Sequence, residues 1–111
     1  MVILKIFYAL LLLVSLPLVA QDSITPEQAA QYAGQTKTVC GKVSQIVTKK
    51  DKVFINFGGN YPKQVFHLYL TQNLDHNFSD YQGKIICATG LIELYRKKPE
   101  ITNPQQIKTA H

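Results

Sequence analysis

Two cysteines, Cys40 and Cys87, are the side chains best suited to covalent chemistry in this 111-residue chain, which has no other cysteine. A pair of cysteines in a small domain of an oxidising compartment is typical of a disulfide. Such a bond would add about 4 kcal/mol to the free energy of unfolding by restricting the unfolded chain. The alternatives are two buried free thiols, or a zinc site completed by His67, although no close Cys-x-x-Cys spacing supports zinc. We therefore predict a Cys40–Cys87 disulfide and no metal.

Six cations fall in two short polar runs, each flanked by apolar stretches. The first run holds Lys49, Lys50 and Lys52, and the second holds Arg96, Lys97 and Lys98. Three tyrosines, Tyr61, Tyr69 and Tyr95, offer rings on which bases can stack. Cationic arms around stacking rings bind single-stranded nucleic acid. The plainer interpretation is that hairpin turns are polar and lysine keeps them soluble, since the net charge of +5 is modest.

Side-chain sets for catalysis are not recognisable in this sequence. It holds no Ser/His/Asp set, metal-ligand cluster or phosphate-binding glycine loop. Asp75-His76 lies in a polar stretch. Gly58-Gly59 precedes Tyr61-Pro62, as expected of a turn. We therefore predict a binding protein without a cofactor rather than an enzyme.

The first 20 residues have the order of a secretory signal peptide. Lys5 precedes an unbroken apolar run from Ile6 to Val14, and Leu18-Val19-Ala20 ends in a small residue. A basic start, an apolar middle and a small-residue end are what signal peptidase requires. A retained anchor is the alternative, but the run is short for a membrane span and Pro17 interrupts it. We predict cleavage after Ala20, a secreted or periplasmic location, and no stable membrane association after processing.

The mature chain, residues 21–111, begins with a helical signal and continues as strands. Thr25, Pro26 and Gln28 form the pattern of a capped helix start, which predicts a helix over residues 22–34. Apolar alternation then predicts strands over residues 36–47, 53–57, 65–70, 84–95 and 99–102. A short helical turn is expected over residues 78–81, and a capped closing turn over residues 103–107.

Five short strands with a helical insert between the third and fourth are typical of one fold class. That order is found in the OB-fold, a small five-stranded barrel. Gly41 in the first strand and Gly90 in the fourth would let both strands bend around the barrel. The sequence therefore predicts a mainly β protein with a single OB-fold domain over residues 21–111.

Seven stretches of the mature chain resemble small exported bacterial OB-fold proteins that are described as nucleic-acid-binding-like and also occur beside thermonuclease-type domains. They are Thr38-Val39-Cys40-Gly41-Lys42-Val43, Phe54-Ile55-Asn56-Phe57-Gly58, Tyr61-Pro62 with Phe66, Tyr81-Gln82-Gly83-Lys84, Cys87-Ala88-Thr89-Gly90, Tyr95 with Pro99 and Ile101, and Pro104-Gln105-Gln106-Ile107. The resemblance covers nearly the whole mature domain and implies its fold, but OB-folds bind many ligands. Relatives tend to carry Gly where this chain has Lys97, which implies a different or strained turn there.

The sequence thus predicts an exported OB-fold module that binds single-stranded DNA or RNA, or another polyanion, weakly and with little sequence preference. The alternative is a protein-interaction or envelope-structural module that does not bind nucleic acid. The two are distinguished by whether the six cations converge on one face with exposed aromatic rings between them.

Overall fold

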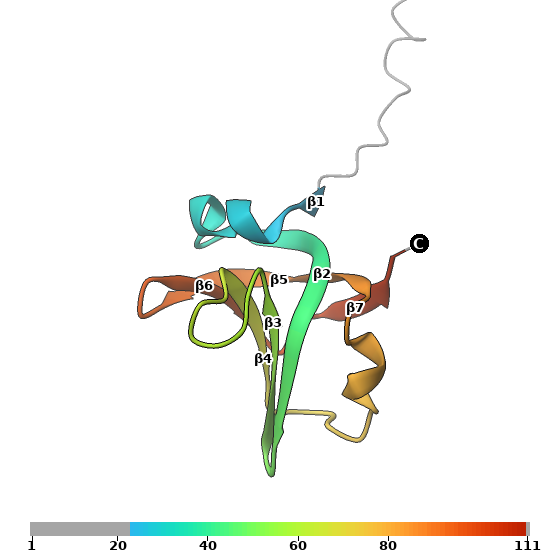
Figure 1. Cartoon of the computed structure of the whole chain (residues 1–111). Coiled ribbons are helices and arrows are strands. Elements are labelled where there is room, and N and C mark those ends of the chain that lie inside the picture. Colours follow the sequence, from blue (N-terminus) through green and yellow to red (C-terminus); the bar gives the residue numbers. More distant parts are fainter. Residues whose placement is uncertain (1–22, 111) are drawn as a thin grey trace, which may run out of the picture.

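The computed structural model describes residues 23–110 as a mainly β structure with two short 3-10 helices (Figure 1). The predicted signal peptide over residues 1–20 and its cleavage point lie outside the described residues. In chain order the elements are β1 (Ser23–Ile24), η2 (Pro26–Tyr32), β2 (Thr36–Lys49), β3 (Lys52–Phe57), β4 (Phe66–Leu70), η3 (Phe78–Tyr81), β5 (Ile85–Tyr95), β6 (Lys98–Thr102) and β7 (Gln106–Thr109). None of the helices in this part of the chain is long and apolar enough to cross a membrane.

Five of the strands close into a ring in the order β2-β3-β4-β6-β5, with β5 pairing back to β2. The order of strands around the ring is the same as their order in the chain, except that β6 comes before β5. β4 and β6 run parallel, whereas the other neighbours in the ring are antiparallel. All five predicted strands are present, and η3 lies between the third and fourth, where the sequence predicts a helical turn.

β2 reaches both of its neighbours in the ring because it is long and curved. Its first half, Thr36–Lys42, pairs with β5, and its second half, Val43–Lys49, pairs with β3. The β2–β3 register shifts between Val43 and Gln45, at the change of partner. Figure 1 shows the strand turning from the β5 side down to the β2–β3 hairpin.

The core fills the inside of the ring with the apolar side chains that the alternation predicts. Val53, Ile55 and Phe57 of β3 are buried, and their alternates face outward. Phe57 meets Phe66 of β4 with ring centroids 5.4 Å apart. The remaining core comes mainly from Leu68, Leu70, Ile86, Ala88, Ile92 and Ile101. Burial of these side chains is the main stabilising term for so small a domain.

Gly41 and Gly90 allow neighbouring groups to approach the backbone closely. A Cβ at Gly41 would overlap the ring of Pro26 in η2. A Cβ at Gly90 would lie 2.6 Å from the Cγ2 atom of Ile101. Contacts this short are not tolerated, so each glycine lets its neighbour pack directly against the strand. The structure thus gives both glycines a packing role in addition to the predicted bending.

The strand ends differ from the predicted ones by one or two residues, and three further features differ in kind. The predicted helix over residues 22–34 is the shorter 3-10 helix η2, which starts where Thr25 N donates to the side-chain Oε1 of Gln28 at 3.0 Å. Residues 23–24 form β1, parallel to β2, instead of belonging to the helix. The predicted closing turn over residues 103–107 leads into β7, which pairs with β5. β1 and β7 were missed because short edge strands carry too little alternation to detect.

The predicted disulfide is present and joins Cys40 of β2 to Cys87 of β5. The two residues are directly opposite in the β2–β5 register, and their Cα atoms are 4.0 Å apart. Because this pairing closes the ring, the bond fastens the closure covalently. With both thiols consumed, buried free thiols and a cysteine-ligated zinc site are excluded. His67 instead forms a 2.8 Å contact with Glu100.

Candidate nucleic-acid interface

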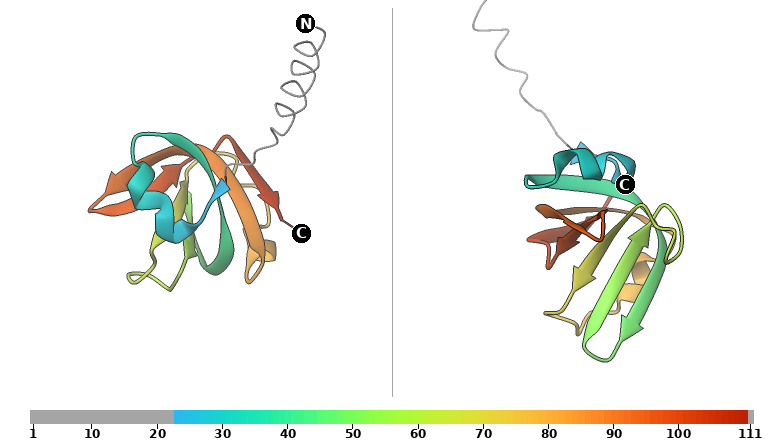
Figure 2. Two further views of the ribbon diagram at one scale, coloured as in Figure 1. Left: turned by 90° about the horizontal axis from the view of Figure 1, so that it is seen from above. Right: turned by 90° about the vertical axis from the view of Figure 1, so that its left-hand side faces the viewer.

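The outward side chains of β2, β3, β4 and β6 form one continuous surface, which we call the outer face. Residues opposite each other on paired strands project to the same side of a sheet. The register therefore sets three rows on the outer face: Lys49 with Lys52; Val47, Phe54, Tyr69 and Thr102; and Gln45, Asn56, His67 and Glu100. Figure 2 (right) shows these strands side by side.

An aromatic pair, Phe54 and Tyr69, occupies the middle row. The rings are stacked, with centroids 5.1 Å apart and planes at 26°, and both side chains are half-buried. Tyr69 is a predicted site residue, whereas Phe54 was missed. The signal was present, because Phe54 alternates with the buried Val53 and Ile55 and must point outward. Partly exposed stacked rings offer a platform for a nucleobase.

The two basic turns lie at opposite ends of the outer face. Lys49 and Lys52 face each other at the base of the β2–β3 turn, and Lys50 lies in that turn. Arg96 and Lys97 form the β5–β6 turn, which Figure 1 shows extending to one side of the ring. Counted along β4 through the strand register, six residue steps of about 3.3 Å separate Lys52 from Lys98, which amounts to about 20 Å. The cations therefore lie at the two ends of the face and do not converge, which by the criterion given above counts in favour of the protein-interaction alternative.

Lys98 is engaged within the fold. Its Nζ donates to the carbonyl oxygens of Pro62 at 2.7 Å and Gln64 at 2.6 Å. Both acceptors belong to the β3–β4 loop, residues 58–65, so Lys98 ties that loop to β6. An ammonium held this way has little freedom to reach a phosphate. The other five predicted cations are at least partly exposed.

The β3–β4 loop crosses the N-terminal end of β4. It covers the row of the outer face that consists of Gln45, Asn56, His67 and Glu100. Tyr61 N and Asn56 Nδ2 both donate to the Oε1 of Gln45, each at 2.8 Å. Gln64 is buried, with its Nε2 3.4 Å from the Nδ1 of His67. His67 and Asn56 are consequently buried as well. What stays accessible on the outer face is the Phe54–Tyr69 end, beside Lys49 and Lys52.

Two further tyrosines are exposed near the face. Tyr61, a predicted site residue, is 70% exposed on the β3–β4 loop. Tyr95 is 52% exposed, and the guanidinium of Arg96 lies 5.2 Å from its ring centroid. Arg96 and Lys97 both have positive φ, 53° and 71°, so the turn is of the left-handed type that favours Gly. The strained conformation implied for Lys97 is therefore present.

Within residues 23–110, no three His, Cys, Asp or Glu side chains are grouped so that they could hold a metal ion.

The fold is similar to that of OB-fold-like proteins of known structure. OBody AM3L15, solved bound to hen egg-white lysozyme, aligns with a TM-score of 0.61 and 14% identity over 83% of this chain and 96% of its own. A putative aspartyl-tRNA synthetase from Leishmania major Friedlin aligns at 0.58 and 12% identity, over 86% of this chain and 22% of its own. Asparaginyl-tRNA synthetase from Pyrococcus horikoshii gives 0.57 and 9% identity, over 79% of this chain and 23% of its own.

No family model matches the sequence, and no curated protein matches it. At these identities the structural likeness establishes an OB-like fold and nothing further. The chain also spans only about a quarter of either synthetase.

Proposed function

We propose that this protein is an exported OB-fold barrel that binds single-stranded nucleic acid on its outer face, without catalysing a reaction. The observation that carries the proposal is the stacked Phe54–Tyr69 pair, half-exposed beside Lys49 and Lys52. Aromatic platforms next to cations hold single strands through base stacking and phosphate contacts. Lys50, Arg96 and Lys97 extend the cationic border to both ends of the face, and Tyr61 adds an exposed ring at its covered end.

Weak binding with little sequence preference is expected from this arrangement. Five cations remain accessible after Lys98 is assigned to the β3–β4 loop. Each phosphate contact on a single strand contributes about −0.7 to the slope of log K against log salt concentration. The slope should therefore be no steeper than about −3.5. Contacts to phosphate position a strand without reading its sequence.

The test is a titration of the purified protein with fluorescein-labelled oligothymidylate, followed by fluorescence anisotropy at several salt concentrations. Reversing Lys49, Lys50 and Lys52 together to Glu should abolish binding. The matched control reverses Lys42, Lys84 and Lys108, three exposed lysines that lie beside β5 and outside the three rows of the outer face, and changes the net charge equally. Equal losses in both variants would show that net charge alone, and not the outer face, attracts the strand.

Stacking is tested separately from charge. Tyr69→Leu keeps apolar volume on β4 but removes the ring, and should weaken binding by about 1–3 kcal/mol. Tyr32→Leu, a half-buried tyrosine of η2, is the control and should leave the Kd unchanged. If wild-type protein does not bind oligothymidylate at low salt, the proposal fails. The alternative of a protein-interaction module then gains, since the similar OBody is bound to lysozyme.

Export is part of the proposal. Disulfides persist in oxidising compartments, so the Cys40–Cys87 bond supports a secreted or periplasmic location. Mass spectrometry of protein recovered from the envelope or the medium should show Gln21 as the first residue. Recovery of an intact form starting at Met1 in the membrane fraction would contradict cleavage.

A further inference from the structure

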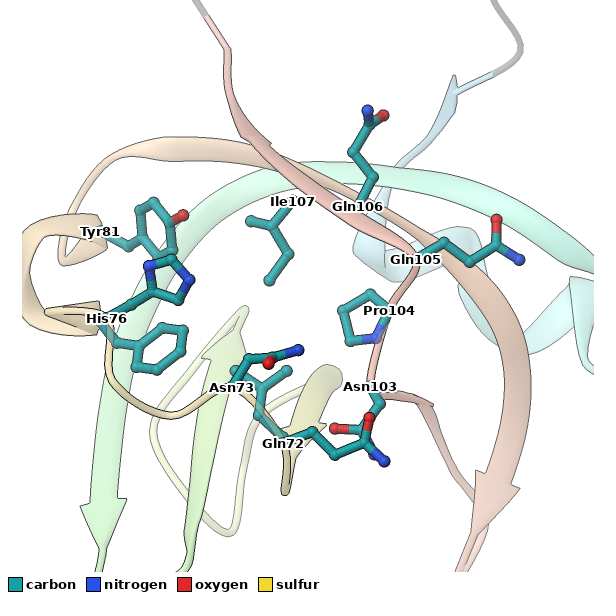
Figure 3. A pocket seen from close by; sticks show the side chains of 11 residues that line it. Gln72, Asn73, His76, Tyr81, Asn103, Pro104, Gln105, Gln106 and Ile107 are labelled. Atoms are coloured by element: carbon teal, nitrogen blue, oxygen red, sulfur yellow. The ribbon is translucent and has the colours of Figure 1, made fainter.

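A hollow of about 240 Å³ lies just past the Tyr69 end of the outer face. One side is the segment that joins β4 to β5, and the other is the segment that joins β6 to β7. Figure 3 shows the two segments facing each other across the opening. The hollow adjoins the outer face, because Asn103 N on its rim donates to the Tyr69 carbonyl at 2.9 Å. It thus begins where a strand stacked on Tyr69 would continue.

The two walls of the hollow differ in chemistry. One wall carries the rings of His76, Phe78 and Tyr81, in which His76 and Phe78 are edge-to-face at 5.6 Å. The opposite wall carries Pro104 and Ile107, and Figure 3 shows Ile107 pointing into the space between the walls. An aromatic wall facing an aliphatic wall accommodates a flat ring. Enzymes that take a base out of its stack hold it between side chains of these two kinds.

Among the polar side chains that line the hollow, the carboxamide of Asn73 lies between the two walls (Figure 3). Figure 3 shows this side chain extending into the hollow from the β4–β5 segment. Asn103 is different, because its amide is bonded to the backbone and hydroxyl of Thr71, both at 2.9 Å. None of the side-chain hydrogen bonds formed within residues 23–110 involves Asn73. The amide of Asn73 is therefore free to pair with a ligand.

Charge and backbone geometry define the ligand further. The lining contains no Lys, Arg, Asp or Glu, so the hollow suits a neutral group rather than a phosphate. Asn73 and Asn103 both have positive φ, 55° and 46°. Asparagine adopts this left-handed conformation more readily than most other residues with a side chain, so both positions can hold it. An asparagine carboxamide makes a paired hydrogen bond to N6 and N7 of adenine.

We propose that the hollow is a base-reading subsite that accepts one adenine of the strand bound on the outer face. The base lies between the ring wall and the Pro104–Ile107 wall, and Asn73 pairs with its N6 and N7 edge. This inference rests on the proposed nucleic-acid binding and adds one position of sequence preference to an otherwise tolerant surface. The phosphates stay with the lysines, and the hollow reads only the base.

The experiment compares oligothymidylates of about nine nucleotides, a length within the range that OB domains cover, with variants carrying one adenine at each position in turn. Anisotropy titrations on the purified protein should show about tenfold tighter binding when the adenine is near one end of the oligonucleotide. Asn73→Asp should erase that preference, because the carboxylate cannot donate to N7. Asp tolerates positive φ, so the fold is expected to persist.

The matched control is Gln106→Glu, which makes the same neutral-to-negative change on the other side of the hollow. Figure 3 shows the Gln106 side chain pointing away from the opening, so the adenine preference should survive. If oligothymidylate binds but adenine gives no advantage at any position, the subsite is refuted while the outer face stands. Loss of the preference in both variants, or a preference that Asn73→Asp leaves intact, refutes the role of Asn73. No binding of any oligonucleotide refutes the proposed function itself.

Discussion

Replacing Lys97 by Gly should stabilise the protein, although it removes a side chain. Lys97 sits at φ 71° in a two-residue turn whose other member, Arg96, has φ 53°. A left-handed conformation costs a non-glycine residue roughly 1–2 kcal/mol. Gly does not have this cost, but its greater conformational entropy stabilises the unfolded chain by about 0.4–1 kcal/mol. The difference predicts a net gain of about 0.5–1 kcal/mol in the free energy of unfolding.

Urea denaturation followed by circular dichroism measures this gain, and thermal melting should rise by about 3–6 °C. Lys50→Gly is the matched control, because Lys50 lies in the β2–β3 turn and is not among the residues with positive φ. It should be neutral or destabilising. If Lys97→Gly lowers the stability, or if the two variants behave alike, the left-handed turn is not a source of strain and the reasoning is wrong.

Three further predictions concern the ties that hold the fold together. The double variant Cys40→Ser/Cys87→Ser should lose about 4 kcal/mol in urea denaturation, because the bond closes 47 positions of the chain; a loss below about 1 kcal/mol would contradict this. Lys98→Met should speed hydrogen exchange in the β3–β4 loop, whereas Lys63→Met, an exposed lysine of the same loop, should not. Gly90→Ala should lower the free energy of unfolding by about 1–3 kcal/mol, because the added methyl group overlaps a buried isoleucine of β6. An unchanged melting temperature would contradict this, because it would mean that the strand shifts to accommodate the methyl group.

The central strands could be predicted because large apolar side chains alternate where a strand has one buried face. Phe66, Leu68 and Leu70 all point into the core, and the polar side chains between them point out. The edges of the sheet carry no such signal. β7 offers the core only Ile107, which is half-buried, so the sequence predicts a closing turn over its first two residues and no strand. The segment is a strand because it pairs with a strand elsewhere in the chain, and its own sequence does not reveal that partner.

The sequence allowed the residues of the candidate site to be predicted, but not which of them are accessible to a ligand. The positions of Lys49 and Lys52 at a hairpin base follow from the strand pattern, and so does the outward direction of Phe54. The engagement of Lys98 does not, since its acceptors lie 34 and 36 positions earlier in the chain. The same packing buries His67 under a loop whose own sequence indicates only a turn. Long-range contacts of this kind decide which cations are free.

The closure of the ring by a covalent bond also determines how the molecule responds to force. The disulfide encloses the stretch from Cys40 to Cys87, which contains β3, β4 and the aromatic pair. Tension applied at the chain ends passes through the sulfur atoms and bypasses that stretch. At about 3.5 Å per residue, roughly 160 Å of chain stays unextended until the bond is reduced. β6, β7 and the outer ends of β2 and β5 can be peeled away, while the Phe54–Tyr69 surface is mechanically shielded.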